Sequence, residues 1–244
     1  MLKKKINFLM VIPARYKSKR FPGKPLAKIK GIPMLKRTYI QCLKATDKKN
    51  IVIATDDLKI KKYCVENNMP VLMTSKKCLT GTDRIAEIAK KKIFDFYINV
   101  QGDEPIFNPL DIISLIKNMY KNPNSVLTGF CAIKDKKLFE SKNIPKVIVG
   151  NENELLYMSR KPIPNNGLNK KLNIFPLRQV CAYSFPRKLL LKFPQKKKTY
   201  LEKLEDIEIL RFLELGISVK LVKMSPKSIA VDIPSDILKV EKQI

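Results

Sequence analysis

Short apolar runs alternate with amphipathic stretches over the first half of this chain, and this alternation limits its fold more than any other feature. The four apolar runs cover residues 6–12, 50–54, 70–73 and 94–100. Apolar runs of this length, bounded by turn-forming residues, predict buried strands. The helical patterns that follow them cover residues 34–43, 58–67, 82–91 and 109–119. Four strand-then-helix units predict βαβ connections and a mainly parallel sheet of the α/β class.

The pattern is less regular in the second half. Strands are expected at residues 125–133, 146–149, 155–157, 178–185, 218–222 and 229–231. Apolar residues share one side of a predicted helix over 201–215, and Pro234 opens a last helix. Residues 161–172, which include two prolines, are predicted to form a loop or flap. No repeat or linker interrupts the sequence, so we expect a single domain over residues 1–244.

The start of the third predicted helix carries a capping signal. Thr82 is placed to cap this helix, and Asp83 lies in its first turn, where an acidic side chain is favourable.

The chain carries 49 lysines and arginines against 22 acidic residues, a formal net charge of +27. Such a charge suits a protein that binds nucleic acid. The lysines, however, are scattered through nearly every segment and are not gathered into one stripe with aromatic residues between them. We therefore interpret most of the charge as a compositional bias, and nucleic-acid binding stays open as the alternative from another functional class.

Histidine is absent, which excludes Ser-His and Cys-His nucleophiles and His-ligated metal sites. The five cysteines are widely spaced without a C-x-x-C pair, so they indicate neither a disulfide framework nor a zinc site, which fits a reducing cytoplasm. The apolar run near the start is too short to span a bilayer and ends in Pro13-Ala-Arg15, so we expect no signal peptide and no membrane segment. Catalysis must then rest on carboxylates, lysine and arginine, with or without a hard metal ion.

The loop after the first apolar run is a candidate binding site. Residues 13–26 combine prolines, one glycine and five cations behind a predicted buried strand. Ligands of open parallel sheets usually bind beyond the carboxyl ends of the strands, and a basic loop there suits a nucleoside triphosphate. A solvated surface turn in a lysine-rich protein explains the charge equally well, so other motifs must decide.

Glycine and arginine recur in the loops after the predicted strands. The glycines are Gly23, Gly81 and Gly102. Glycine lets a phosphate approach the backbone closely. Arg15, Arg20 and Arg84 stand in or beside these loops. A planar guanidinium suits phosphates and base edges better than the point charge of lysine.

Two aspartates each follow a predicted strand. Asp103 comes after the fourth strand, and Asp232 comes after the run 229–231. Mg²⁺ usually takes one or two carboxylates together with substrate phosphates, so this pair could form one metal site. Each aspartate could instead only cap the helix that follows it.

Six motifs resemble, in order and spacing, those of one family of sugar-activating enzymes. They are Pro13-Ala-Arg-Tyr-x-Ser-x-Arg-x-Pro-Gly-Lys-Pro-Leu26, Ala54-Thr-Asp56, Thr80-Gly-Thr-Asp-Arg84, Asn99-Val-Gln-Gly-Asp-Glu-Pro105, Ser159-Arg160 and Val231-Asp-x-Pro-x-Asp236. The chain resembles the CMP-KDO synthetases, or 3-deoxy-manno-octulosonate cytidylyltransferases, over residues 6–242. The first and fourth motifs together are highly specific, whereas the Pro-Ala-Arg loop alone also occurs in other sugar nucleotidyltransferases. The resemblance implies a Rossmann-like, three-layer α/β/α nucleotidyltransferase fold with a small β-rich region for dimerisation or a flap.

The resemblance also implies residue roles. The triphosphate of CTP would be bound by Arg15, Arg20 and the catalytic Lys24. The cytidine side would be bound by Thr82, Arg84 and Gln101. The catalytic residues Asp103 and Asp232 would bind Mg²⁺. Arg160 would bind the carboxylate of the sugar acid, and Gln179, Tyr183 and Glu208 would bind its hydroxyls. Residues 1–124 would mainly bind nucleotide, and 125–244 would bind the sugar acid and form a homodimer. We expect the dimer contact there because the strands and the segment 161–172 have no evident partner within the chain.

The implied reaction is attack by the anomeric hydroxyl of 3-deoxy-D-manno-octulosonate (KDO) on the α-phosphate of CTP. The products are CMP-KDO, used for lipopolysaccharide synthesis, and pyrophosphate. No covalent enzyme intermediate is required, which agrees with the absence of histidine. Catalysis would consist of positioning and charge neutralisation.

Two positions depart from the family's pattern, both in its sugar-acid pocket. Gln179-Val-Cys181 stands where His followed by Leu-Gly is usual, and Glu208-Ile209 stands where Glu-Gln is usual. An unpaired buried hydroxyl costs about 1–3 kcal/mol, so the resemblance specifies the nucleotide better than the sugar. A related acid, such as 8-amino-KDO or a nonulosonic acid, remains an alternative. A nucleotide-binding regulator is disfavoured because both metal-site carboxylates are present.

Overall fold

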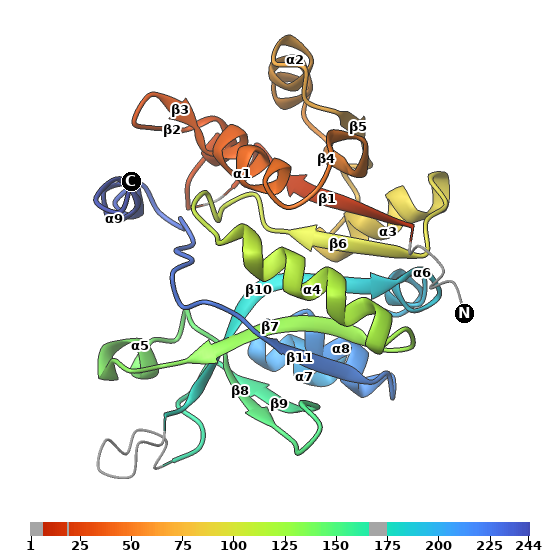
Figure 1. The fold of residues 1–244 in the computed structure, drawn as a ribbon, viewed down its shortest axis with the longest axis vertical. Coiled ribbons are helices and arrows are strands. Elements are labelled where there is room, and N and C mark those ends of the chain that lie inside the picture. The colour runs from red at the N-terminus through yellow and green to blue at the C-terminus, as the bar shows by residue number, and fades with distance from the viewer. Residues whose placement is uncertain (1–6, 19, 166–174) are drawn as a thin grey trace. The chain divides into compact units, whose positions relative to one another are not determined.

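The computed structural model describes residues 7–18, 20–165 and 175–244, and the chain divides into two compact units (Figure 1). Unit 1 comprises residues 1–113 and 227–244, and unit 2 comprises residues 114–226. The boundary falls inside helix α4 (Pro109–Lys121). The C-terminal segment therefore belongs with the first half of the chain.

Four parallel strands form the sheet in the described part of unit 1, in the order β6-β1-β4-β5. They are β1 (Phe8–Ala14), β4 (Ile51–Thr55), β5 (Val71–Met73) and β6 (Phe96–Val100). Every residue of β4 and β6 is buried, as parallel strands covered on both faces usually are. Because the strands are parallel, the loops that leave β1 and β6 start at the same edge of the sheet.

The helices of unit 1 lie on both faces of this sheet. The remaining elements are α1 (Met34–Leu43), α2 (Leu58–Glu66), α3 (Gly81–Lys91), α9 (Asp236–Glu241), the 3-10 turns η1 (Lys24–Leu26) and η2 (Lys48–Asn50), and the hairpin β2 (Lys28–Ile29) with β3 (Ile32–Pro33). The crossovers from β1 to β4 and from β4 to β5 move along the sheet in one direction, whereas the crossover from β5 to β6 moves back past β1 in the opposite direction. Because such crossovers are right-handed, α1 and α2 cover one face and α3 covers the other. Figure 1 shows α1 in front of the sheet and α3 behind it.

Unit 2 carries a mixed sheet. Its strands are β7 (Val126–Ala132), β8 (Lys146–Val149), β9 (Leu155–Ser159), β10 (Leu177–Pro186) and β11 (Val219–Lys223). Strand β7 pairs in parallel with β11 and antiparallel with β10, β8 pairs antiparallel with β10, and β8 pairs antiparallel with β9. The strands of the second half thus have partners within the chain, and the expectation that they lack them is wrong.

The helices of unit 2 are short. They are α5 (Lys136–Glu140), α6 (Arg187–Leu190), the 3-10 turn η3 (Phe193–Gln195), α7 (Tyr200–Glu205) and α8 (Ile209–Glu214). The prediction of one helix over 201–215 is wrong, because α7 ends at Glu205 and the backbone of the next residue, Asp206, is left-handed at φ 50°. The apolar periodicity continues across this break, so the pattern alone does not show it.

The cap predicted for α3 is also wrong. Thr80, not Thr82, caps this helix: its hydroxyl accepts from the Asp83 N–H at 3.1 Å, and the Asp83 carboxylate accepts from the Thr80 N–H at 3.0 Å. This reciprocal pair is a capping box, and a threonine three residues before an acidic residue is its usual sequence signal.

Two predictions near the C-terminus are corrected as well. Residues 229–231 form no strand, although the Val231 N–H donates to the Asp103 carbonyl at 2.9 Å. The last helix begins at Asp236, not at Pro234. Of the segment predicted to be a loop or flap, residues 166–172 lie outside the described residues. The mainly parallel α/β class and the four strand-then-helix units are confirmed.

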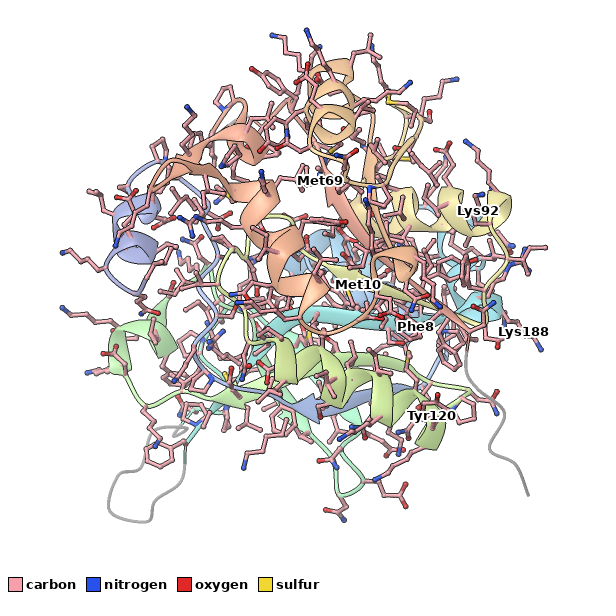
Figure 2. The ribbon with its side chains drawn as sticks, turned by 45° about the horizontal axis from the view of Figure 1, so that its top comes forward. Phe8, Met10, Met69, Lys92, Tyr120 and Lys188 are labelled. Atoms are coloured by element: carbon pink, nitrogen blue, oxygen red, sulfur yellow. The ribbon has the colours of Figure 1, made fainter. Side chains whose placement is uncertain are left out.

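Positive charge is spread over both units. Figure 2 shows nitrogen-tipped side chains projecting from elements of both units, not gathered over one of them. Lys92 and Lys188 are exposed, whereas Met10 of β1 is buried. Within the described ranges, no helix is long and apolar enough to cross a membrane.

Candidate active site

The loop after β1 closes on itself as a compact turn. The Gly23 N–H donates to the Tyr16 carbonyl at 2.9 Å, and the Leu26 N–H donates to the Gly23 carbonyl at 2.9 Å. Gly23 has φ +71°, a left-handed conformation that favours glycine. The turn fixes the backbone on both sides of the basic residues that the sequence assigned to the triphosphate.

Two cations of this loop reach the two predicted metal ligands. Lys24 Nζ lies 2.6 Å from Asp103 Oδ2 and 3.9 Å from Asp232 Oδ1. Arg20 Nη2 donates to Asp232 Oδ1 at 2.9 Å. The aspartate side chains remain 28% and 34% exposed, so both can still meet a ligand. The structure therefore brings four of the predicted residues into one cluster within unit 1.

Backbone contacts hold the loop after β6 in this cluster. A Cβ built on Gly102 would lie 3.0 Å from the Pro13 carbonyl oxygen, so glycine favours this close approach of the loop to the end of β1. The Thr38 hydroxyl donates to the Gly102 carbonyl at 3.2 Å. The buried Glu104 carboxylate accepts a hydrogen bond from the Ser228 hydroxyl, which ties this loop to the C-terminal segment.

Asp232 is fixed in the cluster by Asp236. The Asp236 carboxylate accepts from the Asp232 N–H at 3.0 Å and from the Ile233 N–H at 3.2 Å, and Lys239 Nζ lies 2.7 Å from it. Burial alone would raise the pKa of the Asp236 carboxyl. The Lys239 ammonium and these N–H groups outweigh burial, so its pKa lies below the ordinary value.

The cluster fits a divalent cation that arrives with phosphate. Among the described residues, no three histidine, cysteine, aspartate or glutamate side chains gather as a metal cage. Mg²⁺ does not need such a cage, because it commonly uses one or two carboxylates plus substrate phosphates and water. The Lys24 ammonium already lies between Asp103 and Asp232 as a positive charge. Two accessible carboxylates that share a cation are therefore a suitable donor set for Mg²⁺.

The residues predicted for the cytidine side are mostly buried. Arg84 is fully buried, and its guanidinium donates to Asp56 Oδ2 at 3.1 Å and to the Thr74 hydroxyl. Thr82 is buried in the first turn of α3, whereas Gln101 is half-buried. Arg84 thus fastens the loop before α3 to the end of β4.

Arg15 lies exposed in the same region. Its Nη1 donates to the Leu79 carbonyl at 3.2 Å, so the basic loop is joined to the loop before α3. Gln101 shares the loop after β6 with Asp103, and its carbonyl accepts from the Glu104 N–H at 3.2 Å. The predicted nucleotide residues therefore extend from the start of α3 to the two aspartates.

In unit 2 the structure brings together two of the predicted sugar-acid residues. Gln179 is buried, and its Nε2 donates to the Tyr183 hydroxyl at 3.1 Å and to Thr128 Oγ1 at 3.4 Å. Strand β10 changes register between Val180 and Tyr183, which places Gln179 and Tyr183 on either side of an irregularity. Strand irregularities of this kind often re-aim side chains near binding sites.

Arg160 follows β9 and is held from several sides. Its Nε donates to the Glu205 carbonyl at 2.7 Å, and its backbone N–H donates to Glu205 Oε2 at 2.8 Å. Glu208 is the residue directly before α8, and its neighbour Ile209 is only 2% exposed. Ile209 therefore packs inward, and it offers no polar group at a position where the family usually has one.

Comparison with known proteins decides the family. The cytidylyltransferase family model matches residues 9–225. The 3-deoxy-manno-octulosonate cytidylyltransferase of Geotalea daltonii is 40% identical over 247 residues, which cover 96% of both chains. The mitochondrial enzyme of that name from Arabidopsis thaliana is 37% identical over 95% of this chain and 81% of its own. This chain belongs to the 3-deoxy-manno-octulosonate cytidylyltransferase family.

Solved structures agree with this membership. A CMP:2-keto-3-deoxy-manno-octonic acid synthetase complexed with CTP matches with a TM-score of 0.90 and 32% identity, over 97% of this chain and 98% of that one. HddC from Yersinia pseudotuberculosis matches with a TM-score of 0.69 at 16% identity, which shows the shared fold alone. The nucleotidyltransferase fold predicted from the motifs is thus confirmed for this cytidylyltransferase.

Several residues that hold the aspartate cluster of unit 1 or Arg160 of unit 2 were not assigned from the sequence. Glu205 and Ser228 were not assigned, because single acidic or hydroxyl residues in helices and loops carry no pattern of their own. Asp236 belongs to the last motif but was given no role. The cap at Thr80 could have been found, since the capping box is a sequence signal. The roles of the assigned residues stay predictions.

Proposed function

We propose that this cytidylyltransferase transfers CMP from CTP to the anomeric hydroxyl of KDO and releases pyrophosphate. The observation that carries the proposal is the cluster in which Lys24 contacts both Asp103 and Asp232, beside the carboxyl edge of a parallel sheet. Relatives that are named for this activity align with nearly the whole chain. A metal-assisted nucleotidyl transfer needs these components and no nucleophile from the protein.

The basic loop binds the triphosphate in this proposal. Arg15 and Arg20 are exposed and positive, and Lys24 lies beside the two carboxylates. The phosphates replace the aspartates as partners of Arg20 and Lys24, and these two cations neutralise the phosphate charge. Mg²⁺ bound by Asp103 and Asp232 supplies Lewis-acid stabilisation of the phosphate charge. The protein groups thereby hold the α-phosphate for attack from the side opposite the pyrophosphate.

The acceptor is held by residues of unit 2. Arg160 binds the carboxylate of the sugar acid, and the Gln179–Tyr183 pair faces its hydroxyls. Gln179 already donates to Tyr183 and to Thr128, so both of its amide hydrogens are in use. Because Ile209 is buried and apolar, fewer polar groups fix the sugar than the family usually provides. This observation keeps 8-amino-KDO and nonulosonic acids as second candidates for the acceptor.

We also propose that the protein works in the cytoplasm as a homodimer with CTP, KDO and Mg²⁺. These points rest on the resemblance of its motifs to the family. Light scattering on purified protein after gel filtration measures the mass directly. A mass near twice the 28.1 kDa of one chain is expected, and a mass near that of one chain would contradict the dimer.

An acceptor panel tests the function. Purified protein is mixed with CTP and Mg²⁺ plus KDO, 8-amino-KDO or N-acetylneuraminate, and pyrophosphate release is followed. KDO should give the highest kcat/KM, whereas a preference for another acid would transfer the assignment to that acid. Absence of release with all acids, together with duplex binding that is steeply salt-dependent and insensitive to CTP, would favour the nucleic-acid alternative.

A further inference from the structure

Three backbone carbonyls hold the guanidinium of Arg160. Its Nε donates to the Glu205 carbonyl at 2.7 Å, Nη2 donates to the Asp206 carbonyl at 2.9 Å, and Nη1 donates to the Lys142 carbonyl at 3.2 Å. All three acceptors are neutral. The guanidinium is therefore fixed in place while its positive charge is left without a directly bonded carboxylate among these partners. That combination suits a receptor for an anion.

The carboxylate of Glu205 contacts the backbone of Arg160 and not its guanidinium. Glu205 Oε2 accepts from the Arg160 N–H at 2.8 Å, and Oε1 accepts from the hydroxyls of Ser159 at 2.8 Å and Tyr157 at 3.3 Å. Burial alone would raise the pKa of the Glu205 carboxyl. These hydrogen bonds outweigh burial, so its pKa lies below the ordinary value and the group stays ionised.

The end of α7 supplies two of the acceptors. Glu205 is the last residue of this helix, and Asp206 follows in a left-handed conformation at φ 50°. Carbonyls in the last turn of a helix have no partner within the helix. Here Arg160 takes the carbonyls of both residues. The break between α7 and α8 thus has a use that the apolar pattern does not reveal.

A buried lysine holds the third acceptor segment. Lys146 is fully buried, and its Nζ donates to the carbonyls of Ser141 and Ile144, each at 2.9 Å, and to the carbonyl of Arg160. Burial, and then the nearby Arg160 charge, lower the pKa of this ammonium. Lys146 therefore joins the backbone of Arg160 to the segment that carries Lys142.

We propose that Glu205 is a positioning residue that holds Arg160 as a preformed receptor for the carboxylate of the acceptor sugar. This inference rests on the proposed function, because it names the group that aims the residue assigned to that carboxylate. Glu205 acts twice, through its side chain on the Arg160 N–H and through its own carbonyl on the guanidinium. A carboxylate placed on the guanidinium itself would neutralise the charge that the substrate needs.

Glu205→Gln tests the proposal, because it removes the charge and keeps the size. The Kd of the sugar acid, measured by calorimetry, and its KM should both rise about tenfold. A rise of this size corresponds to the loss of one hydrogen bond to a charged group. The KM for CTP, and kcat at saturating acid, should stay within about twofold of wild type, since uniform binding is removed. Tyr157→Phe removes one hydroxyl from Glu205 and should weaken acid binding less, in the same direction.

Two comparisons separate positioning from loss of structure. Glu214→Gln is the matched control, because Glu214 also has a lowered pKa and accepts the Leu201 N–H at 3.0 Å without contacting Arg160. An analogue of the sugar with a hydroxymethyl group in place of the carboxylate should bind wild type and Glu205→Gln equally weakly. Glu205→Gln should therefore lose most of the preference for acid over analogue, whereas Glu214→Gln should keep it.

The affinities for the acid and for the analogue decide between positioning and loss of structure. Equal loss of affinity for the acid and for the analogue, or acid binding unchanged by both Glu205→Gln and Tyr157→Phe, would overturn the positioning role. If Glu205→Gln fails to fold, Tyr157→Phe decides alone by its effect on the preference for acid. Wild-type protein that neither binds nor converts any sugar acid would overturn the proposed function first, and the inference with it.

Discussion

The Lys24 ammonium lies 2.6 Å from the Asp103 carboxylate, and the same ammonium lies 3.9 Å from Asp232. A side chain assigned to the triphosphate thus contacts the groups assigned to the metal. Arg20 repeats the arrangement on Asp232 at 2.9 Å. Phosphate and metal can replace these ion pairs together, because the phosphate pairs with Lys24 and Arg20 while the metal pairs with the two carboxylates. The relationship predicts that the two ligands help each other to bind.

The first prediction concerns the carboxylates. Asp103→Asn and Asp232→Asn should each lower kcat by at least about 100-fold, because each removes negative charge from the proposed Mg²⁺ site. Circular dichroism and the urea midpoint should stay near wild type, since both side chains are partly exposed. Near-normal turnover in either variant would exclude that residue from the mechanism.

The second prediction concerns Lys24. Lys24→Met should raise the affinity of the nucleotide-free protein for Mn²⁺ about two- to fivefold, because a partly exposed ion pair contributes about 0–1 kcal/mol. The same variant should bind CTP more weakly. Mn²⁺ binding is measured by electron paramagnetic resonance without nucleotide, and Lys28→Met, at an exposed residue of the adjacent hairpin, is the control. Lower Mn²⁺ affinity in Lys24→Met would contradict the competition between Lys24 and the metal.

The third prediction concerns the buried ion pair between the short helices of unit 2. Arg211 Nε and Nη2 each lie 2.6 Å from the Glu202 carboxylate, and both side chains are almost fully buried. Arg211→Met leaves a buried carboxylate unpaired and should lower the free energy of unfolding by about 3–5 kcal/mol. Urea denaturation measures the loss. The double variant with Glu202→Gln should recover part of it, and a further loss in the double variant would argue against the buried charge as the cause.

The fourth prediction concerns pH. Because the pKa of Glu205 is below its ordinary value of about 4.3, its ionised form stabilises the folded protein above that pH, and this contribution is lost as pH falls through the folded pKa. The difference in unfolding free energy between wild type and Glu205→Gln should therefore be constant near neutral pH and should shrink as the pH falls below about 4.3. Glu140→Gln, at a 58% exposed side chain, should follow the wild-type curve. A difference that stays constant at acidic pH as well would show that the charge of Glu205 does not matter.

The regular half of the fold could be predicted because most residues of β1, β4 and β6 are buried. The runs that became β4 and β6 are mostly apolar, and helix α1 matches its predicted bounds at Met34 and Leu43. The second half could not be predicted as well, because its outcome depends on contacts between distant segments. The break at Asp206 is an example, since its carbonyl binds Arg160 across 46 residues of sequence.

The candidate site divides in the same way. Lys24, Asp103 and Asp232 were assigned from motifs, and the structure places them in contact. The residues that aim Arg160 could not be found from the sequence, because two of its three acceptors are backbone carbonyls at a helix end and the third lies in a loop. Main-chain acceptors leave no residue type to recognise.

Phosphorus NMR of a mixture of protein, CTP, Mg²⁺ and KDO tests the central claim most directly. Wild type should convert the three CTP signals into one phosphodiester signal of a CMP-sugar and one signal of pyrophosphate, which is twice as intense because pyrophosphate holds two equivalent phosphorus atoms. The Asp103→Asn variant should leave CTP unchanged over the same time. Release of inorganic phosphate, or a CTP spectrum that wild-type protein leaves unaltered, would contradict cytidylyl transfer by this protein.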